Sequence, residues 1–358
     1  MHPALHTPLV DLLGSRYPII QTGMGWVAGP KLVSATSNAG AFGIIASATM
    51  TYDELVVAIA ETKKRTTAPF GVNMRADADD IMDRLKLLVA QGIPVASFAQ
   101  APKKDLIEYL HDHGVKVMPS IGAKRHAEKV MEWGVDAILV QGGEGGGHTG
   151  SVPTSLLLPE VVDVVAGRVP VVAAGGYFDG RGLVSALAYG ASGIAMGTRF
   201  LLTSDSPVPM EVKKEYLGTA VTGTLVTTKI DGAPHRVIRT KLVDQMDGAS
   251  PFTAVPKAVA NAARFRKYTG LSWFQMLNEG REMKKRMGLP WAEIIMAGNT
   301  PILTKATLVD GELGAGILPT GQVVGVIDDL PSAEELINRI IEQAETTLDR
   351  LAGRTPGS

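Results

Sequence analysis

The segment Gln141–Gly150 carries the residue types in this chain that are best suited to chemistry. It follows the apolar run Ala137–Val140, which predicts a buried strand. Six of its ten residues are glycine, so the backbone can approach a ligand without interference from Cβ atoms. His148 adds an imidazole that can bind or release a proton near neutral pH. A strand that leads into such a loop favours an enzyme site, and the alternative is an ordinary glycine-rich loop with a surface histidine.

Two side chains of this loop are candidates for proton transfer or anion binding. His148 could accept a proton from a substrate carbon, or it could stabilise a bound anion. Glu144 could orient the loop amides or serve as a weaker base. The other six histidines have no comparable setting, and no cluster of residues has metal-ligand spacing. We therefore predict no catalytic metal.

Short apolar strands alternate with helical patterns about eight times between residues 18 and 200. Helical segments such as 53–63 repeat apolar residues at three- and four-residue spacing, as in a helix with one buried face. Continuous apolar strands joined by helices predict a parallel sheet that is covered on its outer side. Eight such units predict a (β/α)₈ TIM barrel, with a doubly wound open sheet as the alternative. The predicted strands are Pro18–Gly23, Ala41–Ala46, Phe70–Met74, Val95–Ala99, Lys116–Ile121, Ala137–Gly142, Pro170–Gly176 and Gly193–Phe200.

Polar and glycine-rich motifs come directly after these strands, where the active site of such a barrel lies. Ala173–Gly176 and Ala195–Thr198 would offer main-chain N–H groups at neighbouring strand ends, a favourable setting for a phosphate group. The Thr198 hydroxyl could donate a further hydrogen bond there. Tight packing of loop on helix is the alternative for either motif.

Three side chains near strand ends could contact a planar cofactor. Asn73 and Gln141 carry amides that could hydrogen-bond the edge of a heterocycle, and capping of the next helix or loop is the alternative. Lys124 could lie beside the N1–C2 carbonyl of a flavin and favour its reduced, negatively charged form. A solvated lysine at the start of a helix is the alternative for that position.

Composition sets broad limits on the class of protein. The chain has 358 residues, 45% of them hydrophobic, enough for one barrel with an appendage or for two domains. With a formal net charge of −1, the protein as a whole has no positive electrostatic field that would attract polyanions. The lack of cysteine excludes disulfides and thiolate chemistry. The start shows no signal-peptide pattern, and no apolar run approaches the roughly 18 residues of a spanning helix. We expect a soluble, cytoplasmic protein that binds neither nucleic acid nor membrane.

The pattern changes after the eighth predicted strand. We expect a barrel at 1–205, a basic and mostly helical insertion at 206–305, and a return segment with a C-terminal helix at 306–358. Residues 211–290 hold 14 Lys or Arg against 7 Asp or Glu. Within the return segment, Gly321 favours a turn and Gln322 offers a hydrogen-bond donor, and both could reach the site. An amphipathic helix is predicted from Ser332 to about Leu351.

With these motifs assembled, the chain resembles the nitronate monooxygenase family, formerly called 2-nitropropane dioxygenases. The likeness covers residues 8–205 and resumes around 314–325. Its most specific part is Gln141–His148, which is similar to the family signature Gln-Gly-x-Glu-Ala-Gly-Gly-His. The resemblance implies a (β/α)₈ barrel that binds FMN, with His148 as the catalytic residue on the substrate side of the flavin. The implied FMN contacts are Thr22, Gly23, Met24, Asn73, Lys124, Gln141, Gly146, Gly147, Gly175, Gly176, Ala195, Met196, Gly197 and Thr198.

Some features depart from the common family pattern. The first motif is Gln21–Trp26 in place of Gly-Pro-Met-Ala-Gly, Gly145 stands where the signature has Ala, and the basic insertion is long. In these respects the chain is similar to a branch of flavin-dependent dehydrogenases that act on hydroxylated indane-carboxyl-CoA thioesters in steroid ring breakdown. Coenzyme A carries several phosphates, which the basic insertion would suit. A solvated basic face, or a contact within a homo-oligomer, is the alternative for the insertion.

Three functions remain in competition. The leading hypothesis is an FMN-dependent oxidoreductase that oxidises alkyl nitronates with O₂ to a carbonyl compound and nitrite. The first alternative is a flavin-dependent dehydrogenase or enoyl reductase that acts on a CoA thioester and uses another electron partner. The second alternative is a flavin-free barrel that binds a phosphate ligand.

Overall fold

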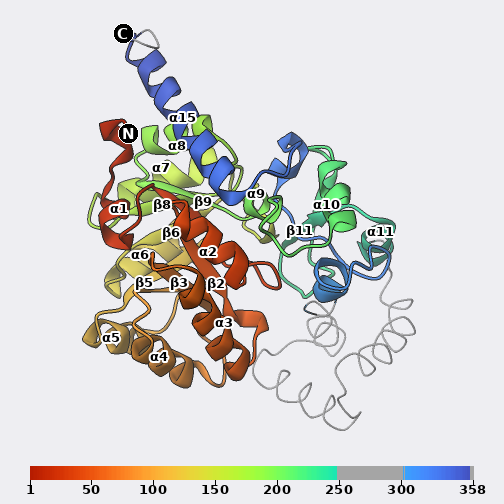
Figure 1. Cartoon of the computed structure of the whole chain (residues 1–358), viewed down its shortest axis with the longest axis horizontal. Helices are drawn as coiled ribbons and strands as arrows, with labels where there is room; N and C mark the ends of the chain where they lie inside the picture. The colour runs from red at the N-terminus through yellow and green to blue at the C-terminus, as the bar shows by residue number, and fades with distance from the viewer. Residues whose placement is uncertain (248–300, 302, 355–358) are drawn as a thin grey trace.

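Eight parallel strands close into a barrel in the order β1-β2-β3-β4-β5-β6-β8-β9, and β9 pairs back on β1. Figure 1 shows the barrel with its helices around it. The computed structural model describes residues 1–247, 301 and 303–354. The closed order confirms the predicted (β/α)₈ barrel and excludes the open sheet. The strands are Ile19–Gln21 (β1), Phe42–Ala46 (β2), Phe70–Met74 (β3), Val95–Phe98 (β4), Lys116–Ile121 (β5), Ile138–Gln141 (β6), Val171–Ala174 (β8) and Gly193–Met196 (β9).

The eighth predicted strand, Gly193–Phe200, was too long. In the structure β9 ends at Met196, and Thr198–Leu201 form the short helix α9. Phe200 is fully buried within this helix, so the apolar pattern by itself did not distinguish strand from helix.

Apolar side chains fill the interior of the barrel. Leu9 and Leu13 of helix α1 (Pro8–Leu13) belong to the same buried cluster as the inward side chains of the strands. A Cβ placed on Gly193, the first residue of β9, would lie 2.6 Å from a Leu9 methyl carbon. Because α1 closes the barrel at the amino ends of the strands, a ligand would have to bind at the carboxyl ends. The strand residues of the cluster are Ile20, Phe42, Ile44, Val95, Met118, Leu139, Val172, Ala174 and Ala195.

A larger apolar cluster lies between the barrel and its surrounding helices. Helix α3 illustrates why these segments are helical: Thr51 and Glu54 form a capping box at its start, and its last turn is basic. The helices and 3₁₀ turns of this layer are η1 (Pro3–Leu5), α2 (Pro30–Asn38), η2 (Ser47–Thr49), α3 (Tyr52–Arg65), α4 (Ile81–Ala90), α5 (Lys104–Asp112), α6 (Lys124–Glu132), α7 (Thr154–Val165) and α8 (Gly180–Ala188).

A three-stranded antiparallel sheet adjoins the barrel, in the order β10-β11-β7. It consists of Gly147–His148 (β7), Thr224–Thr227 (β10) and His235–Ile238 (β11). Since β7 belongs to the glycine-rich loop, the sheet ties that loop to chain beyond the barrel. The described part of the expected insertion thus holds a β-hairpin together with helices α10 (Met210–Leu217) and α11 (Lys241–Asp247). The helical pattern at 255–290 lies outside the described residues.

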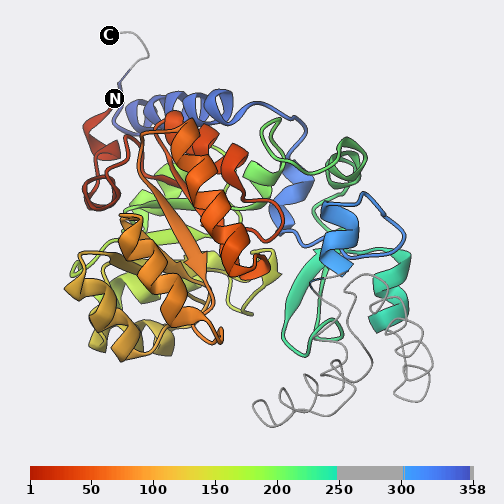
Figure 2. The same ribbon diagram turned by 60° about the horizontal axis from the view of Figure 1, so that its bottom comes forward.

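The return segment runs back over the barrel. It forms η3 (Gln322–Val326) and then α15 (Ala333–Leu351), which confirms the predicted C-terminal helix. Ser332 and Glu335 form its capping box. Helix α15 packs along α8 and α2. Figure 2 shows it in blue, lying across one side of the barrel. The amino group of Met1 lies 3.4 Å from the Glu345 carboxylate. Among the described helices, none has the length and apolar character needed to cross a membrane.

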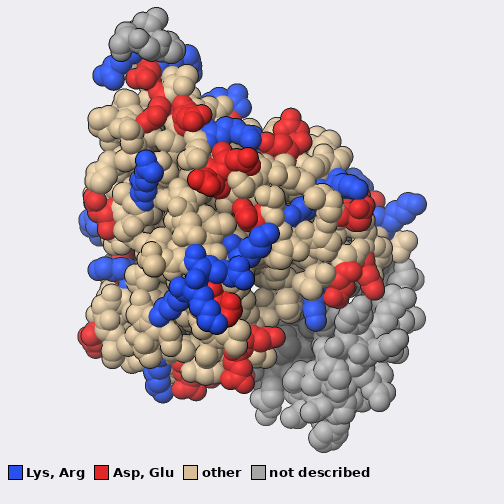
Figure 3. Space-filling view, in the orientation of Figure 1, with Lys and Arg blue, Asp and Glu red and all other residues tan. Residues whose placement is uncertain are grey.

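Charges of both signs share the visible surface of the molecule (Figure 3). Lys and Arg lie among Asp and Glu over the face that is drawn, in keeping with the formal net charge of −1.

Candidate active site

A cavity of about 430 Å³ lies at the carboxyl ends of the barrel strands. Pockets that hold small molecules and cofactors measure roughly 300–1,000 Å³. His148 lines the cavity, as do all the predicted cofactor contacts except Lys124. Their contact with FMN stays a prediction, but the structure brings them to one place. These residues are Thr22, Gly23, Met24, Asn73, Gln141, Gly146, Gly147, Gly175, Gly176, Ala195, Met196, Gly197 and Thr198.

Lys124 lies apart from this group, which corrects its expected position. It is the first residue of α6, and its amine lies 3.9 Å from the Glu160 carboxylate on α7. Its side chain is 48% exposed, so the alternative of a solvated lysine at a helix start describes it better. The chain has already turned outward after Ile121 at the end of β5, and Ser120 lines the cavity from that strand.

Glu144 anchors the glycine-rich loop to helix α7. Its carboxylate accepts hydrogen bonds from the N–H of Thr154 at 2.9 Å and from its hydroxyl at 2.7 Å. Thr154 is the first residue of α7, so the negative charge also faces the positive end of the helix dipole. These contacts favour the orienting role of Glu144 over its role as a base.

Gln141 holds the same loop from the inside. Its side-chain amide donates hydrogen bonds to the carbonyl oxygens of His148 at 2.8 Å and Gly146 at 3.4 Å. A Cβ on Gly145 would lie 2.5 Å from the Gln141 amide nitrogen. Glycine at this position, where the family signature has alanine, therefore leaves the space that the Gln141 amide occupies.

The return segment completes the cavity. The N–H of Gly321 donates to the Thr198 hydroxyl at 3.0 Å, and the N–H of Gln322 donates to the Glu144 carbonyl at 2.9 Å. Thr320 and Gly321 both line the cavity. The prediction that this segment reaches the site is confirmed for Gly321, whereas Gln322 bonds to the loop and does not line the cavity.

The turn after β8 needs glycine for its backbone conformation. Gly175 has φ +95° and Gly176 has φ +84°, a region that residues with side chains rarely adopt. A Cβ on Gly175 would lie 3.1 Å from the Thr154 hydroxyl, whereas a Cβ on Gly176 would meet only the Glu144 Cβ at 3.8 Å. Gly176 thus faces open space, and both residues line the cavity.

Trp26 is a strained residue beside the cavity. Its φ of +66° is unusual for a bulky side chain. Its indole N–H is buried without a hydrogen-bond partner among the described residues. The amine of Lys305 lies 5.7 Å from the centre of the ring. Strain of this kind is more frequent at functional sites than elsewhere.

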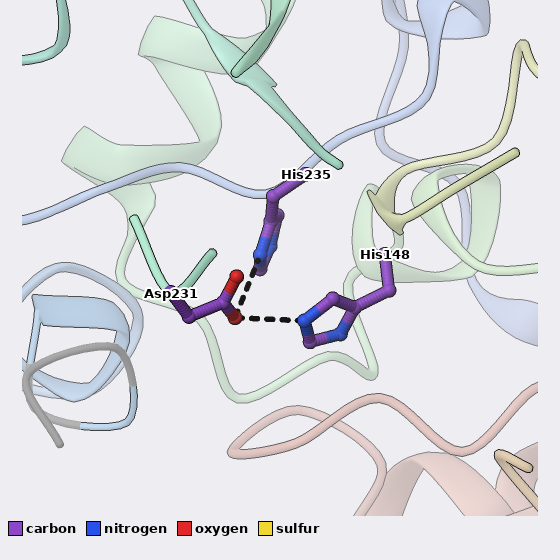
Figure 4. Close-up of side chains that lie close together, drawn as sticks. All are labelled: His148, Asp231 and His235. Atoms are coloured by element: carbon purple, nitrogen blue, oxygen red, sulfur yellow. Dashed lines mark hydrogen bonds and ion pairs between the residues drawn. The ribbon is translucent and has the colours of Figure 1, made fainter. Parts of the chain in front are cut away.

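His148 belongs to a cluster with Asp231 and His235 (Figure 4). Its Nε2 lies 2.7 Å from Asp231 Oδ2, and His235 Nδ1 lies 3.6 Å from the same oxygen. The two imidazoles pack with ring centres 4.6 Å apart and planes tilted by 45°. His148 is 63% exposed, whereas the side chains of Asp231 and His235 are 10% and 6% exposed.

The charge of Asp231 is set by these neighbours. Burial alone would raise its pKa, but the hydrogen bond from His148 and the neighbouring His235 outweigh that effect and hold the pKa well below its usual range. Asp231 is therefore an ionised acceptor near neutral pH.

Sequence reasoning missed Asp231 and His235. The expectation that the other six histidines lack a setting like that of His148 was wrong for His235, which lines the cavity. The cluster joins residues 83 positions apart through the pairing of β11 with β7, which no local spacing reveals. The one available signal was Asp231-Gly232, a turn dipeptide, before the alternating run His235–Ile238.

The model of one family, nitronate monooxygenase, matches residues 6–343 of this chain. The chain belongs to the nitronate monooxygenase family. It is 56% identical over 345 residues to the (3aS,4S,5R,7aS)-5-hydroxy-7a-methyl-1-oxo-octahydro-1H-indene-4-carboxyl-CoA dehydrogenase of Mycobacterium tuberculosis, covering 96% of this chain and 97% of that protein. The dehydrogenase of the same name from Rhodococcus jostii is 54% identical, covering 97% of this chain and 98% of that protein.

A solved structure supports the same relationship. FabK from Thermotoga maritima matches with a TM-score of 0.79 at 31% sequence identity, covering 97% of this chain and 99% of that chain. The family and the dehydrogenases of the same family together make this protein an oxidoreductase.

Proposed function

We propose that the protein is an FMN-dependent dehydrogenase that acts on the CoA thioester of a hydroxylated bicyclic carboxylic acid. The observation that carries the proposal is the 56% and 54% identity, along nearly the whole chain, to two dehydrogenases of such a thioester. This adopts the first alternative of the sequence analysis over the leading one, oxidation of alkyl nitronates with O₂. Nitronate oxidation is supported by the family's name and by lower similarity, 30% identity over 310 residues, to a probable nitronate monooxygenase of Staphylococcus saprophyticus.

The described residues fit a flavin in the cavity. Gly176 leaves open space beside the end of β8, and the backbone of Gly197 and Thr198 follows at the neighbouring end of β9. We propose that these strand ends hold the phosphate of FMN, as such ends do in many barrels of this kind. When bound, the flavin would supply the two-electron acceptor that a dehydrogenation requires.

This chain's own residues would handle the proton. Dehydrogenation breaks two C–H bonds, one with loss of a proton and one with loss of a hydride equivalent. The C–H next to the thioester carbonyl is the more acidic of these two bonds. We propose that His148 accepts this proton, because its imidazole lines the cavity and is exposed enough for a substrate to reach. Glu144 is committed to α7 and keeps the loop that carries His148 in place.

Lys305 offers a positive charge at the edge of the cavity. Thr304 and Leu308, on either side of it in sequence, line the cavity, and its amine stands over Trp26. We propose that Lys305 contributes to holding a phosphate of coenzyme A. The sequence analysis assigned the same purpose to the basic insertion as a whole, and the part of it at 248–300 lies outside the described residues.

Anaerobic flavin reduction tests the proposed function. The purified protein should be yellow, and the released flavin should be FMN by chromatography. Mixing it without O₂ with a hydroxylated indane-carboxyl-CoA thioester should bleach the flavin promptly, whereas ethyl nitronate should bleach it slowly or not at all. Bleaching by the nitronate alone would restore the nitronate hypothesis. A colourless protein that binds no added FMN would favour the flavin-free barrel.

A further inference from the structure

The Asp231 carboxylate is held rigidly beside His148. Its Oδ1 accepts the N–H of Ala233 at 3.2 Å, within a turn where Gly232 has φ +86°. The carbonyl of Pro234 then accepts the N–H of Thr149 at 3.0 Å, so the turn is bonded to the residue that follows His148. The carboxylate is therefore placed by backbone on both sides, and its 2.7 Å contact with Nε2 is the length of a charge-assisted hydrogen bond.

An ionised carboxylate can only accept hydrogen bonds. This decides which nitrogen of the His148 ring carries the hydrogen. Nε2 of His148 must carry the hydrogen in order to donate to Asp231. In the neutral imidazole the lone pair is then on Nδ1. Figure 4 shows this second ring nitrogen directed away from Asp231.

We propose that Asp231 is a positioning residue that fixes His148 in the Nε2–H tautomer and leaves Nδ1 as its proton-accepting atom. The proposal rests on the proposed function in one respect, namely that His148 acts as the base. After proton transfer, the same carboxylate would stabilise the imidazolium, as the aspartate does in catalytic triads of hydrolases.

His235 supports this arrangement from the buried side. Its ring packs against that of His148, and β11 pairs with β7 in the register that places the two residues opposite each other. Both of its ring nitrogens are buried without a hydrogen-bond partner among the described residues. It therefore restricts rotation of the His148 ring by contact. Its Nδ1 is 3.6 Å from the Asp231 oxygen that lies 2.7 Å from His148, so His148 makes the shorter contact.

A cation between these side chains is the competing explanation, since one ligand atom from each lies within 4.8 Å of the others. Ligands at about 2.0–2.1 Å from a tetrahedral zinc ion would be separated from each other by roughly 3.3 Å. The 2.7 Å separation of His148 Nε2 and Asp231 Oδ2 is shorter than that. Direct hydrogen bonding describes the pair better.

Nitrogen-15 NMR of the holoenzyme tests the tautomer without reference to any substrate. Long-range spectra should show His148 with a protonated Nε2 and an unprotonated Nδ1, with His148→Gln used to assign its signals. A protonated Nδ1 with an unprotonated Nε2 in the wild-type protein would overturn the proposal. Because this measurement needs no turnover, it stands even if the enzyme acts on another substrate.

The isosteric variant Asp231→Asn tests the consequence for catalysis. Its amide nitrogen can donate to Nε2 and so favour the opposite tautomer, which should lower kcat by about 10²- to 10⁴-fold while flavin content and KM change little. Asp136→Asn is the matched control, because Asp136 lies 2.8 Å from His111 in a second such pair outside the cavity. An unchanged kcat in Asp231→Asn would overturn the proposal. Loss of activity on EDTA treatment with recovery on adding one equivalent of Zn²⁺ would do so too, in favour of the cation.

Discussion

Gly146 and Gly321 lie with their backbones in direct contact: a Cβ on Gly146 would be only 2.4 Å from the Gly321 nitrogen. One residue belongs to the glycine-rich loop after β6, and the other to the return segment 175 residues later. Two segments therefore form the wall of the cavity on this side. Their backbones can touch only if neither has a side chain at the point of contact. The loop therefore needs glycine here so that another part of the protein can approach its backbone, in addition to any ligand that does so.

Replacing Gly146 with alanine should open this wall. The added methyl group cannot be accommodated by rotation of a side chain, because the atoms it meets are backbone atoms of Thr320 and Gly321. We expect weaker binding of the proposed flavin and a lower melting temperature, measured by flavin absorbance after gel filtration and by thermal unfolding. Gly122→Ala is the control, since its nearest contact would be an ordinary 3.7 Å. Equal behaviour of the two variants would show that the contact is unimportant.

Removing the imidazole of His148 should separate catalysis from cofactor binding. The His148 side chain is exposed at the cavity, and its backbone is held by β7 and by the Gln141 amide, which remain in His148→Ala. We expect turnover to fall by about 10²- to 10⁴-fold with flavin content unchanged. Single-turnover reduction by the CoA thioester would measure this. His113→Ala, next to α5 on the outside of the barrel, is the control. A variant that loses its flavin would instead make His148 a structural residue.

The barrel and most of the cavity could be predicted because their signals are local. Phe70–Met74 and Lys116–Ile121 are short, mostly apolar runs between helical patterns, and both strands have the predicted bounds. Parallel strands in a closed barrel bring their carboxyl ends together, so residues just after separate strands had to meet. Lys124 was misplaced because only two residues separate it from β5, and their direction away from the cavity is not a property of the sequence pattern.

The Asp231–His235 part of the site depends on non-local pairing. Strand β7 has only the two residues Gly147–His148, too short for any alternation to be recognised. Its partner β11 lies in a segment whose basic character suggested a different role. Only the folded chain, with the register His235 opposite His148, shows that this segment supplies the carboxylate.

A side chain at Gly176 should block the proposed phosphate position without disturbing the protein around it. A Cβ there meets no protein atom closer than 3.8 Å, so Gly176→Val adds bulk on the open side of the turn. The φ of +84° adds strain of about 1–2 kcal/mol for any residue with a Cβ. We expect a large loss of FMN affinity by fluorescence titration.

Gly114→Val controls for that strain. Gly114 has φ +73° and open space around its Cβ position, and it precedes β5 at the opposite end of the barrel. Flavin affinity should be unchanged in this variant. If Gly176→Val bound FMN as well as Gly114→Val does, the phosphate would have to lie elsewhere.

Asp329 should make stability depend on pH, because it joins the return segment to the barrel. Its Oδ1 accepts a hydrogen bond from Arg199 at 2.8 Å, and its Oδ2 accepts one from Arg339 of α15. Burial alone would raise the pKa of Asp329, but the two arginines hold it below its usual range. A depressed folded-state pKa contributes stability that is present above the unfolded value of about 3.9 and is lost as pH falls through the folded value.

Asp329→Asn should therefore destabilise the protein near neutral pH. Arg199 is 4% exposed and would lose its charged partner, at a cost of about 1–2 kcal/mol, reduced because Asp329 itself is 36% exposed to screening by water. The difference in free energy of unfolding between wild type and variant, from urea titrations, should shrink as pH is lowered below about 4. Asp349→Asn, which changes only the exposed pair with Arg354, should show little effect at either pH. A difference that grew on acidification would mean that Asp329 is not ionised in the folded protein.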